Sequence, residues 1–256
     1  MEKKKNDFIA QGSILAIASI LVRVMGMIYR IPMTAIIGDK GNGFYSYAYS
    51  VYTILLLLSS YSLPLAVSKM VSAKAQLGQW RNVKRVFICA IAFAIGIGTT
   101  FGLIVLIGAQ FFTRVFFHSE LAAIALRFMA PTILIMALLG VFRGFFQGLQ
   151  NTLPTAVSQI VEGLINAIMS VVFAYFLFDF GHGMDVASGT TDLGYAWGAA
   201  GGAIGTGAGA LAGLIFCFIL FVAYRKILAV NISRDKTGTQ QEYGDIFRLM
   251  LSIALP

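Results

Sequence analysis

Long apolar runs separated by short polar segments make up most of the chain. Each of six runs exceeds about 18 residues, the length at which an α-helix can cross a hydrocarbon core of about 30 Å. The pattern therefore predicts an all-α integral membrane protein with six transmembrane helices. These runs are Ile9–Ile37, Phe44–Val67, Val86–Gln110, Leu121–Phe142, Thr155–Phe178 and Ala196–Tyr224.

A seventh apolar run begins near Ile246 and reaches only to Pro256, which is too short to span a bilayer. We therefore expect three parts: a transmembrane lobe over residues 1–225, a cytoplasmic loop over 226–245, and the truncated start of a seventh helix over 246–256. The same reasoning leads us to expect that the chain is a fragment and that a C-terminal lobe is missing.

The composition agrees with a membrane protein, because 58% of the residues are hydrophobic, 12% are charged and the mean hydropathy is +0.82. Cys89 and Cys217 lie inside apolar runs, as buried thiols do. The net charge of +8 is concentrated between runs two and three and after run six. Basic loops mark the cytoplasmic side, so the charge predicts a cytoplasmic N-terminus and membrane lipids as partners. No nucleic acid is needed to explain it, since no nucleic-acid-binding motif is present.

The first run contains two arginines in the stretch ILVRVMGMIYRIP, residues 20–32. An arginine at the bilayer centre costs about 2.5–3.5 kcal/mol on insertion scales. Seven positions on an α-helix correspond to about 20° of rotation and about 10.5 Å of rise, so Arg23 and Arg30 form a column on one face. Arg23, near mid-membrane, predicts a polar cavity for an anionic group; Arg30, nearer the outer surface, fits either that cavity or snorkelling to the headgroups.

Two other runs carry charges. Arg127 lies near the outer end of run four, where snorkelling explains it equally well. Glu162 in run five is the acid that lies inside a span, and a carboxyl at that depth is either protonated or paired with a base such as Arg23 or Arg143. A coupling role and a structural role for Glu162 both stay open.

Smaller signals also carry predictions. Tyr45, Tyr49 and Tyr52 follow helical spacing, which favours an aromatic belt at the outer interface over stacking against a sugar. Pro64 predicts a break in run two.

Glycines recur every fourth residue in run six, a pattern that allows close helix approach in lipid. They are Gly201, Gly205, Gly209 and Gly213. His182 and Asp185 are expected in a solvated outer loop, residues 179–192, rather than in a metal site. The sequence shows no set of residues that suggests an enzyme.

Two stretches resemble a known family. They are FRGFFQGLQNTLPTAVSQIVEG, residues 142–163, and GFYSYAYSVYTILLLLSSYSLPLAVSKMVS, residues 43–72. The chain looks like the polysaccharide-exporter branch of the multidrug/oligosaccharidyl-lipid/polysaccharide (MOP) flippase superfamily. It is most similar to the stage V sporulation protein B group, related to MurJ-type lipid II flippases.

The resemblance implies about fourteen helices in two lobes around a central cavity, with this chain as the N-terminal lobe in a bacterial cell membrane. It also implies alternating access, in which the lobes rock to move a lipid-linked sugar. MurJ-type proteins carry an arginine pair within a pattern like S-R-V-L-G-x-x-R. Here the sequence reads V-R-V-M-G-M-I-Y-R, so Arg23 matches the first arginine of the pattern. Tyr29 stands at the position of the second arginine, and Arg30 is displaced from it by one residue.

Three functions stay open from the sequence. The first is a flippase for an undecaprenyl-pyrophosphate-linked sugar, such as lipid II or a polysaccharide unit. In it Arg23 contacts the pyrophosphate, Arg30 and Arg127 assist, and Glu162 and Arg143 form an ion pair or take part in coupling. The others are a cation-coupled multidrug exporter and a non-transporting scaffold for cell-wall or spore assembly. No cofactor is expected, although coupling to an ion gradient or membrane potential stays open.

Overall fold

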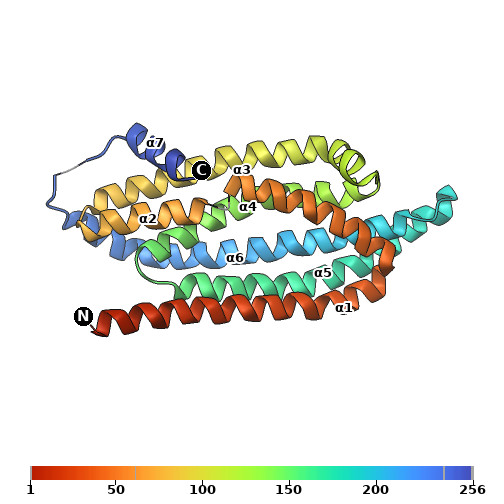
Figure 1. Ribbon diagram of the computed structural model, residues 1–256, viewed down its shortest axis with the longest axis horizontal. Coiled ribbons are helices and arrows are strands. Elements are labelled where there is room, and N and C mark those ends of the chain that lie inside the picture. Colours follow the sequence, from red (N-terminus) through yellow and green to blue (C-terminus); the bar gives the residue numbers. More distant parts are fainter. Residues whose placement is uncertain (1, 61, 239, 255–256) are drawn as a thin grey trace.

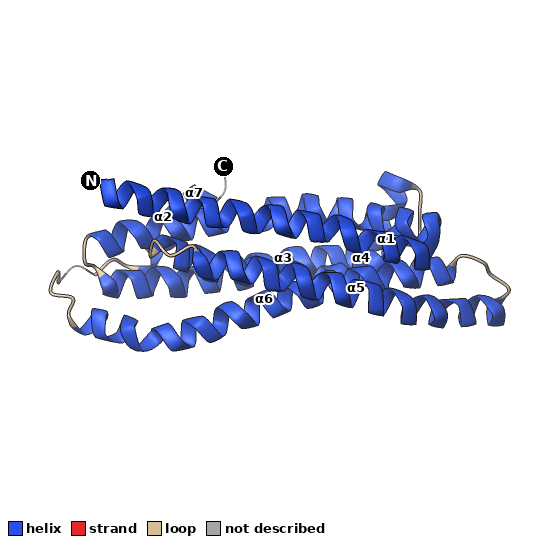
Figure 2. Ribbon diagram, turned by 90° about the horizontal axis from the view of Figure 1, so that it is seen from below, coloured by secondary structure: helices blue, strands red, loops and turns tan. Residues whose placement is uncertain are grey.

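The computed structural model describes residues 2–60, 62–238 and 240–254, and these form a bundle of long helices that run along one common axis (Figures 1 and 2). The N-terminus and α7 lie toward the same end of the bundle. The elements are α1 (Glu2–Ser60), α2 (Leu63–Gln76), α3 (Trp80–Phe117), α4 (Ala122–Gly148), α5 (Leu153–Ser188), α6 (Leu193–Ser233) and α7 (Tyr243–Ala254).

Helix α1 contains two membrane spans rather than one. Its 59 residues would extend about 88 Å as a straight helix, roughly three times the hydrocarbon thickness. Gly38 has φ 63° and ψ −177°, a conformation that glycine adopts readily, and the chain reverses there (Figure 1). Five helical stretches of the described residues are long and apolar enough to cross a membrane, and the first of them, Gly12–Gln76, contains predicted runs one and two, folded back at Gly38. The other four correspond to predicted runs three to six.

The break predicted at Pro64 is also present. Helix α1 ends at Ser60 and α2 begins at Leu63, with Pro64 in the first turn of α2. Proline is tolerated at this position because the first N–H groups of a helix have no intrahelical partner. The second limb of α1 and α2 together make one interrupted span.

The predicted outer loop over residues 179–192 is wrong. Helix α5 continues to Ser188, so His182 and Asp185 are helical and only a short connection leads to α6. Asp185 accepts hydrogen bonds from the backbone N–H groups of Leu193 at 3.0 Å and Gly194 at 2.8 Å. It therefore satisfies donors at the start of α6, a role that its acidic character suits.

At the end of the bundle near α7, polar contacts fasten the segment that follows α6. Helix α6 continues to Ser233, inside the range expected as loop, and Asp235 lies two residues beyond its end. The backbone N–H of Arg81 donates to Asp235 at 3.0 Å, and Thr237 donates both its N–H and its hydroxyl. These hydrogen bonds, led by the one from Arg81, lower the pKa of Asp235 from its usual value.

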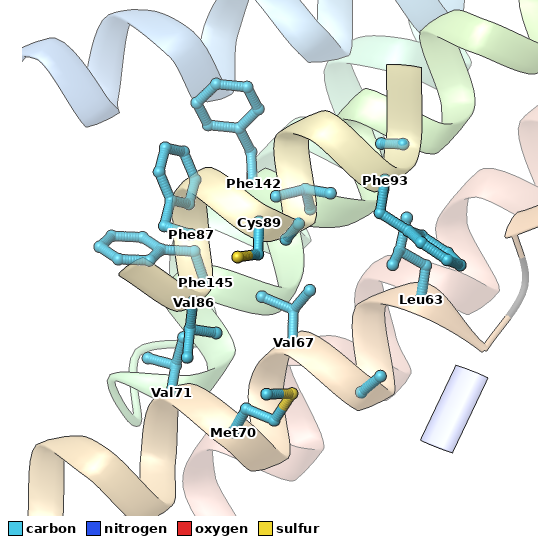
Figure 3. Close-up of a cluster of buried hydrophobic side chains, with 14 of the residues drawn as sticks. Leu63, Val67, Met70, Val71, Val86, Phe87, Cys89, Phe93, Phe142 and Phe145 are labelled. Carbon is cyan, nitrogen blue, oxygen red and sulfur yellow. The ribbon is translucent and has the colours of Figure 1, made fainter. Parts of the chain in front are cut away.

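The interior is filled by two apolar clusters. One lies between α2, α3, α4, α6 and α7, and Figure 3 shows part of it, including Phe87 and Phe145. The ring centroid of Phe87 lies 4.9 Å from that of Phe145 and 4.5 Å from that of Phe221, on which it stacks. The second lies around the turn of α1 and includes buried Met33, Ile37 and Tyr45. Most other apolar side chains face outward, as expected for a surface covered by lipid.

The glycine stripe of run six brings α5 and α6 into close backbone contact, as predicted. A Cβ added at Gly205 would collide with the backbone and hydroxyl of Ser170, and one added at Gly209 would lie 2.6 Å from the Glu162 carbonyl oxygen. Both glycines are therefore required by packing rather than by backbone conformation.

We predict that Gly205→Ala lowers stability in detergent by about 1–3 kcal/mol, because the added methyl group overpacks the α5–α6 contact. Gly96→Ala is the matched control, since nothing lies within 4 Å of the Cβ position on that exposed face of α3. Thermal unfolding of both variants measures the difference. Equal melting temperatures for the two variants would contradict the packing explanation.

Candidate functional site

A polar cavity of about 240 Å³ lies between the two limbs of α1 and α5, and we call it the outer cavity. Arg30 is the charged side chain among its lining residues. The lining residues are Val22, Gly26, Tyr29, Arg30, Tyr45, Tyr49, Gly163 and Asn166. Arg30 therefore faces a polar space, although its position in the sequence is displaced by one residue from the family pattern.

The turn at Gly38 explains why these residues meet. It folds the tyrosines of the second limb back onto the first limb, and Tyr45 and Tyr49 stack at 5.8 Å between ring centroids. The Tyr45 hydroxyl lies 3.2 Å from Thr206 Oγ1 of α6. The prediction of an aromatic belt is wrong for Tyr45 and Tyr52, which are only 2% and 3% exposed and lie inside the lobe.

A second space, the inner cavity, has a volume of about 270 Å³ and lies at the break between α1 and α2. It is bounded by α1, α2, α4 and α5. Its lining residues are Leu56, Ser60, Pro64, Met136, Gly140, Arg143, Gln147, Thr155 and Gln159. Polar side chains thus gather where the interrupted helix leaves backbone groups without helical partners.

An ion pair joins α4 and α5 beside the inner cavity. Arg143 Nη2 lies 2.7 Å from Glu162 Oε2, and Arg143 Nε donates to Ser158 Oγ at 2.8 Å. The side chains of Arg143 and Glu162 are only 12% and 24% exposed. Of the two bases considered for Glu162, the structure brings Arg143 to it.

One polar stripe on α5 connects the two cavities. Thr155, Gln159, Glu162 and Asn166 follow at intervals of four, three and four residues, which is one face of a helix. Thr155 and Gln159 line the inner cavity, and Asn166 lines the outer cavity. Gln159 and Asn166 were not predicted as site residues, although the spacing of polar residues in this apolar run could have indicated them.

The structure does not gather all the predicted arginines. Arg23 is exposed on α1, makes no hydrogen bond or ion pair with the described residues, and is not among the residues that line the two cavities. Arg127 is exposed on α4, where its Nη2 lies 3.5 Å from Gln110 Oε1 of α3. Arg143 and Glu162 therefore lie in the polar interior of this lobe, whereas Arg30 is an exposed side chain that lines the outer cavity.

Sequence comparison agrees with this architecture. The family model described as "Polysaccharide biosynthesis protein" matches residues 8–240. The chain belongs to this family. It is 26% identical over 256 residues to stage V sporulation protein B of Bacillus subtilis (strain 168), covering 98% of this chain and 46% of that protein. It is also 26% identical to the lipid II flippase MurJ of the same organism, covering 95% of this chain and 44% of that protein.

Solved structures show the same fold. A MOP superfamily transporter from Pyrococcus furiosus aligns with a TM-score of 0.67 at 16% identity, over 95% of this chain and 50% of that one. A MATE protein in complex with MaD3S aligns with a TM-score of 0.64 at 15% identity, over 95% of this chain and 52% of that one. These likenesses show the fold, and the family model confirms the predicted resemblance to polysaccharide biosynthesis proteins. This chain spans about half the length of the relatives it matches.

We predict that Glu162→Ala lowers the free energy of unfolding by about 3 kcal/mol, because it leaves the Arg143 guanidinium largely buried without its partner. Glu162→Leu combined with Arg143→Leu is expected to recover most of that loss, since no charge then stays unpaired. Chemical or thermal unfolding in detergent measures both variants.

The control is Glu120→Ala in the exposed Arg114–Glu120 pair, whose atoms lie 3.6 Å apart with side chains 74% and 59% exposed. An exposed pair contributes about 0–1 kcal/mol, so this variant should unfold close to the unaltered chain. A loss at Glu120 as large as that at Glu162 would show that burial of the inner pair is not the cause.

Proposed function

We propose that this chain forms the substrate-facing lobe of a flippase that moves an undecaprenyl-pyrophosphate-linked sugar across the bacterial cytoplasmic membrane. The observation that carries the proposal is Arg30 in the outer cavity. A guanidinium group presents a fork of donors that matches phosphate oxygens, and its charge favours an anionic ligand. Family membership and the likeness to MurJ support the same substrate class.

The tyrosines of the outer cavity fit the sugar of such a ligand. Tyr29, Tyr45 and Tyr49 are among the residues that line the space. An aromatic ring combines an apolar face with a polar end, and a sugar ring presents the same combination. We therefore assign the pyrophosphate to Arg30 and the first sugar to the tyrosine surface.

Arg23 provides a second cationic position for a moving ligand. It stands about 10.5 Å below Arg30 on nearly the same face of α1. Its guanidinium has no partner among the described residues, so it is available for the phosphates when the lobes rock. Arg127 lies outside this proposed site, because it sits between α3 and α4 beside Gln110.

Transport would follow the alternating-access scheme of the superfamily. A second lobe would close the cavity from the other side, the N-terminus would be cytoplasmic, and lipid chains would stay in the bilayer while the headgroup crosses. Binding and rocking suffice for this scheme, and no covalent bond changes. Coupling to an ion gradient or to the membrane potential would set its direction.

The charge of the two cavities disfavours the cation-coupled drug exporter. Such a site attracts cations with carboxylates that lack a basic partner, whereas Glu162 is bound to Arg143 at 2.7 Å. Among the residues that line the outer cavity, the charged group is cationic. A scaffold without transport activity would need no such cavity, and ligand binding distinguishes it from the flippase.

We predict that Arg30→Gln weakens binding of an undecaprenyl-pyrophosphate-linked disaccharide by about 10- to 100-fold. A hydrogen bond to a charged group contributes about 1.5–3 kcal/mol, and each 1.4 kcal/mol corresponds to a tenfold change in Kd. Titration of the full chain in lipid nanodiscs measures the constant. Translocation, which under this proposal needs the second lobe, should fall in parallel in proteoliposomes that contain both lobes.

Arg114→Gln is the matched control, because Arg114 is an exposed arginine near the end of α3. Its variant should bind and translocate like the unaltered chain. If Arg30→Gln binds as tightly as Arg114→Gln, the outer cavity is not the pyrophosphate site.

A further inference from the structure

We propose that the inner cavity is a second binding position for an uncharged, hydroxyl- or amide-bearing part of the sugar headgroup, with Gln159 as its acceptor. This inference rests on the proposed function and adds a position for the sugar that lies beyond the first. Nothing in the arrangement of Arg30 and the tyrosines requires a polar cavity at the break between α1 and α2. The helix break explains why polar groups gather there, but it does not explain why the buried Gln159 Oε1 has no donor.

The charges of the inner cavity cancel. Arg143 is its charged lining residue, and its guanidinium is engaged by the Glu162 carboxylate at 2.7 Å and by Ser158 Oγ at 2.8 Å. A free phosphate would have to compete with Glu162 for Arg143, and a cation would meet the guanidinium. The cavity thus suits neither ion and favours a neutral polar group.

Gln159 indicates what that group must provide. Its Oε1 atom is buried and accepts no hydrogen bond from the described residues. A buried acceptor left without a donor costs about 1–3 kcal/mol, so such atoms are rare in folded proteins. The hydroxyl or amide N–H of a ligand would supply the missing donor.

The other polar groups of the cavity already have partners. Gln147 Nε2 donates to Thr155 Oγ1 at 3.4 Å, and the Ser60 hydroxyl lies 3.0 Å from that of Ser59. Gln159 is therefore the residue of this lining at which an added donor satisfies a buried acceptor. The specificity of the inner cavity should depend on this side chain more than on its neighbours.

The spacing along α5 relates the two cavities to one ligand. Gln159 and Asn166 are seven residues apart, so they lie on nearly the same face about 10.5 Å apart along the helix axis. A pyrophosphate at Arg30 and a donor at Gln159 would thus be joined by a short oligosaccharide. The Glu162–Arg143 pair lies between the two positions. Because the two charges neutralise one another, the sugar would pass a surface with no net charge.

The test uses two lipids and the full chain in nanodiscs. One lipid is undecaprenyl pyrophosphate, and the other carries a disaccharide of N-acetylated sugars on the same pyrophosphate. Gln159→Leu should raise the Kd of the sugar-bearing lipid about 3- to 10-fold, the value of one neutral hydrogen bond, and should change the Kd of the bare lipid less than about twofold. Arg30→Gln should weaken the binding of both lipids.

Two comparisons keep the result interpretable. Gln76→Leu, at the exposed end of α2, is the matched control and should bind both lipids like the unaltered chain. The melting temperature of Gln159→Leu without lipid should not fall below that of the unaltered chain, because the substitution removes an acceptor that has no donor. If the leucine variant does not fold, Gln159→Met tests the same loss with an unbranched side chain.

Each outcome separates the two proposals. Unchanged binding of the sugar-bearing lipid by Gln159→Leu or Gln159→Met, or equal loss for both lipids, would overturn the inner position and mean that water alone fills the cavity. If the unaltered chain binds neither lipid, the proposed function itself fails. A selective loss of affinity for the sugar-bearing lipid supports both the proposed function and the inner binding position.

Discussion

Close backbone contact between α5 and α6 is the constraint on which the rest of the lobe depends. In lipid there is little hydrophobic drive between helices, so they associate through packing of small residues and through interhelical hydrogen bonds. Gly205 against Ser170 and Gly209 against Glu162 allow that contact. With α5 held in this way, its polar stripe lies inside the lobe, where α1 and α4 can meet it, instead of facing acyl chains.

The polar interior then divides by charge. Arg143 and Glu162 neutralise one another across α4 and α5, while Arg30 faces the outer cavity as a cation. The proposed flippase function calls for both kinds of surface: a cationic group for the phosphates and a neutral polar surface for sugars. Under that proposal, the phosphates and the sugars are recognised at different positions in the lobe. The Arg143–Glu162 ion pair joins α4 to α5 between these positions.

Breaks in the helices supply the space for these cavities. The chain reverses at Gly38, which brings Tyr45 and Tyr49 to the cavity that Arg30 also lines. The interruption before Pro64 lies at the inner cavity. Irregular backbone at membrane depth is stable only where it is buried in protein or lines a polar cavity. The two breaks and the two cavities therefore depend on one another.

Much of the fold was predictable because lipid imposes a simple rule of length and hydropathy on each span, and local residue types reveal breaks and close contacts. The six spans, the break at Pro64 and the α5–α6 glycine contact all follow from that rule. The sequence alone could not decide the neighbours of a side chain. Helical spacing places Tyr45 and Tyr52 on one face, but whether that face meets lipid or protein depends on how α1 folds back. The same applies to Arg30, Arg143 and Gln159: the sequence shows that these residues are polar, whereas packing between helices decides which neighbours they meet.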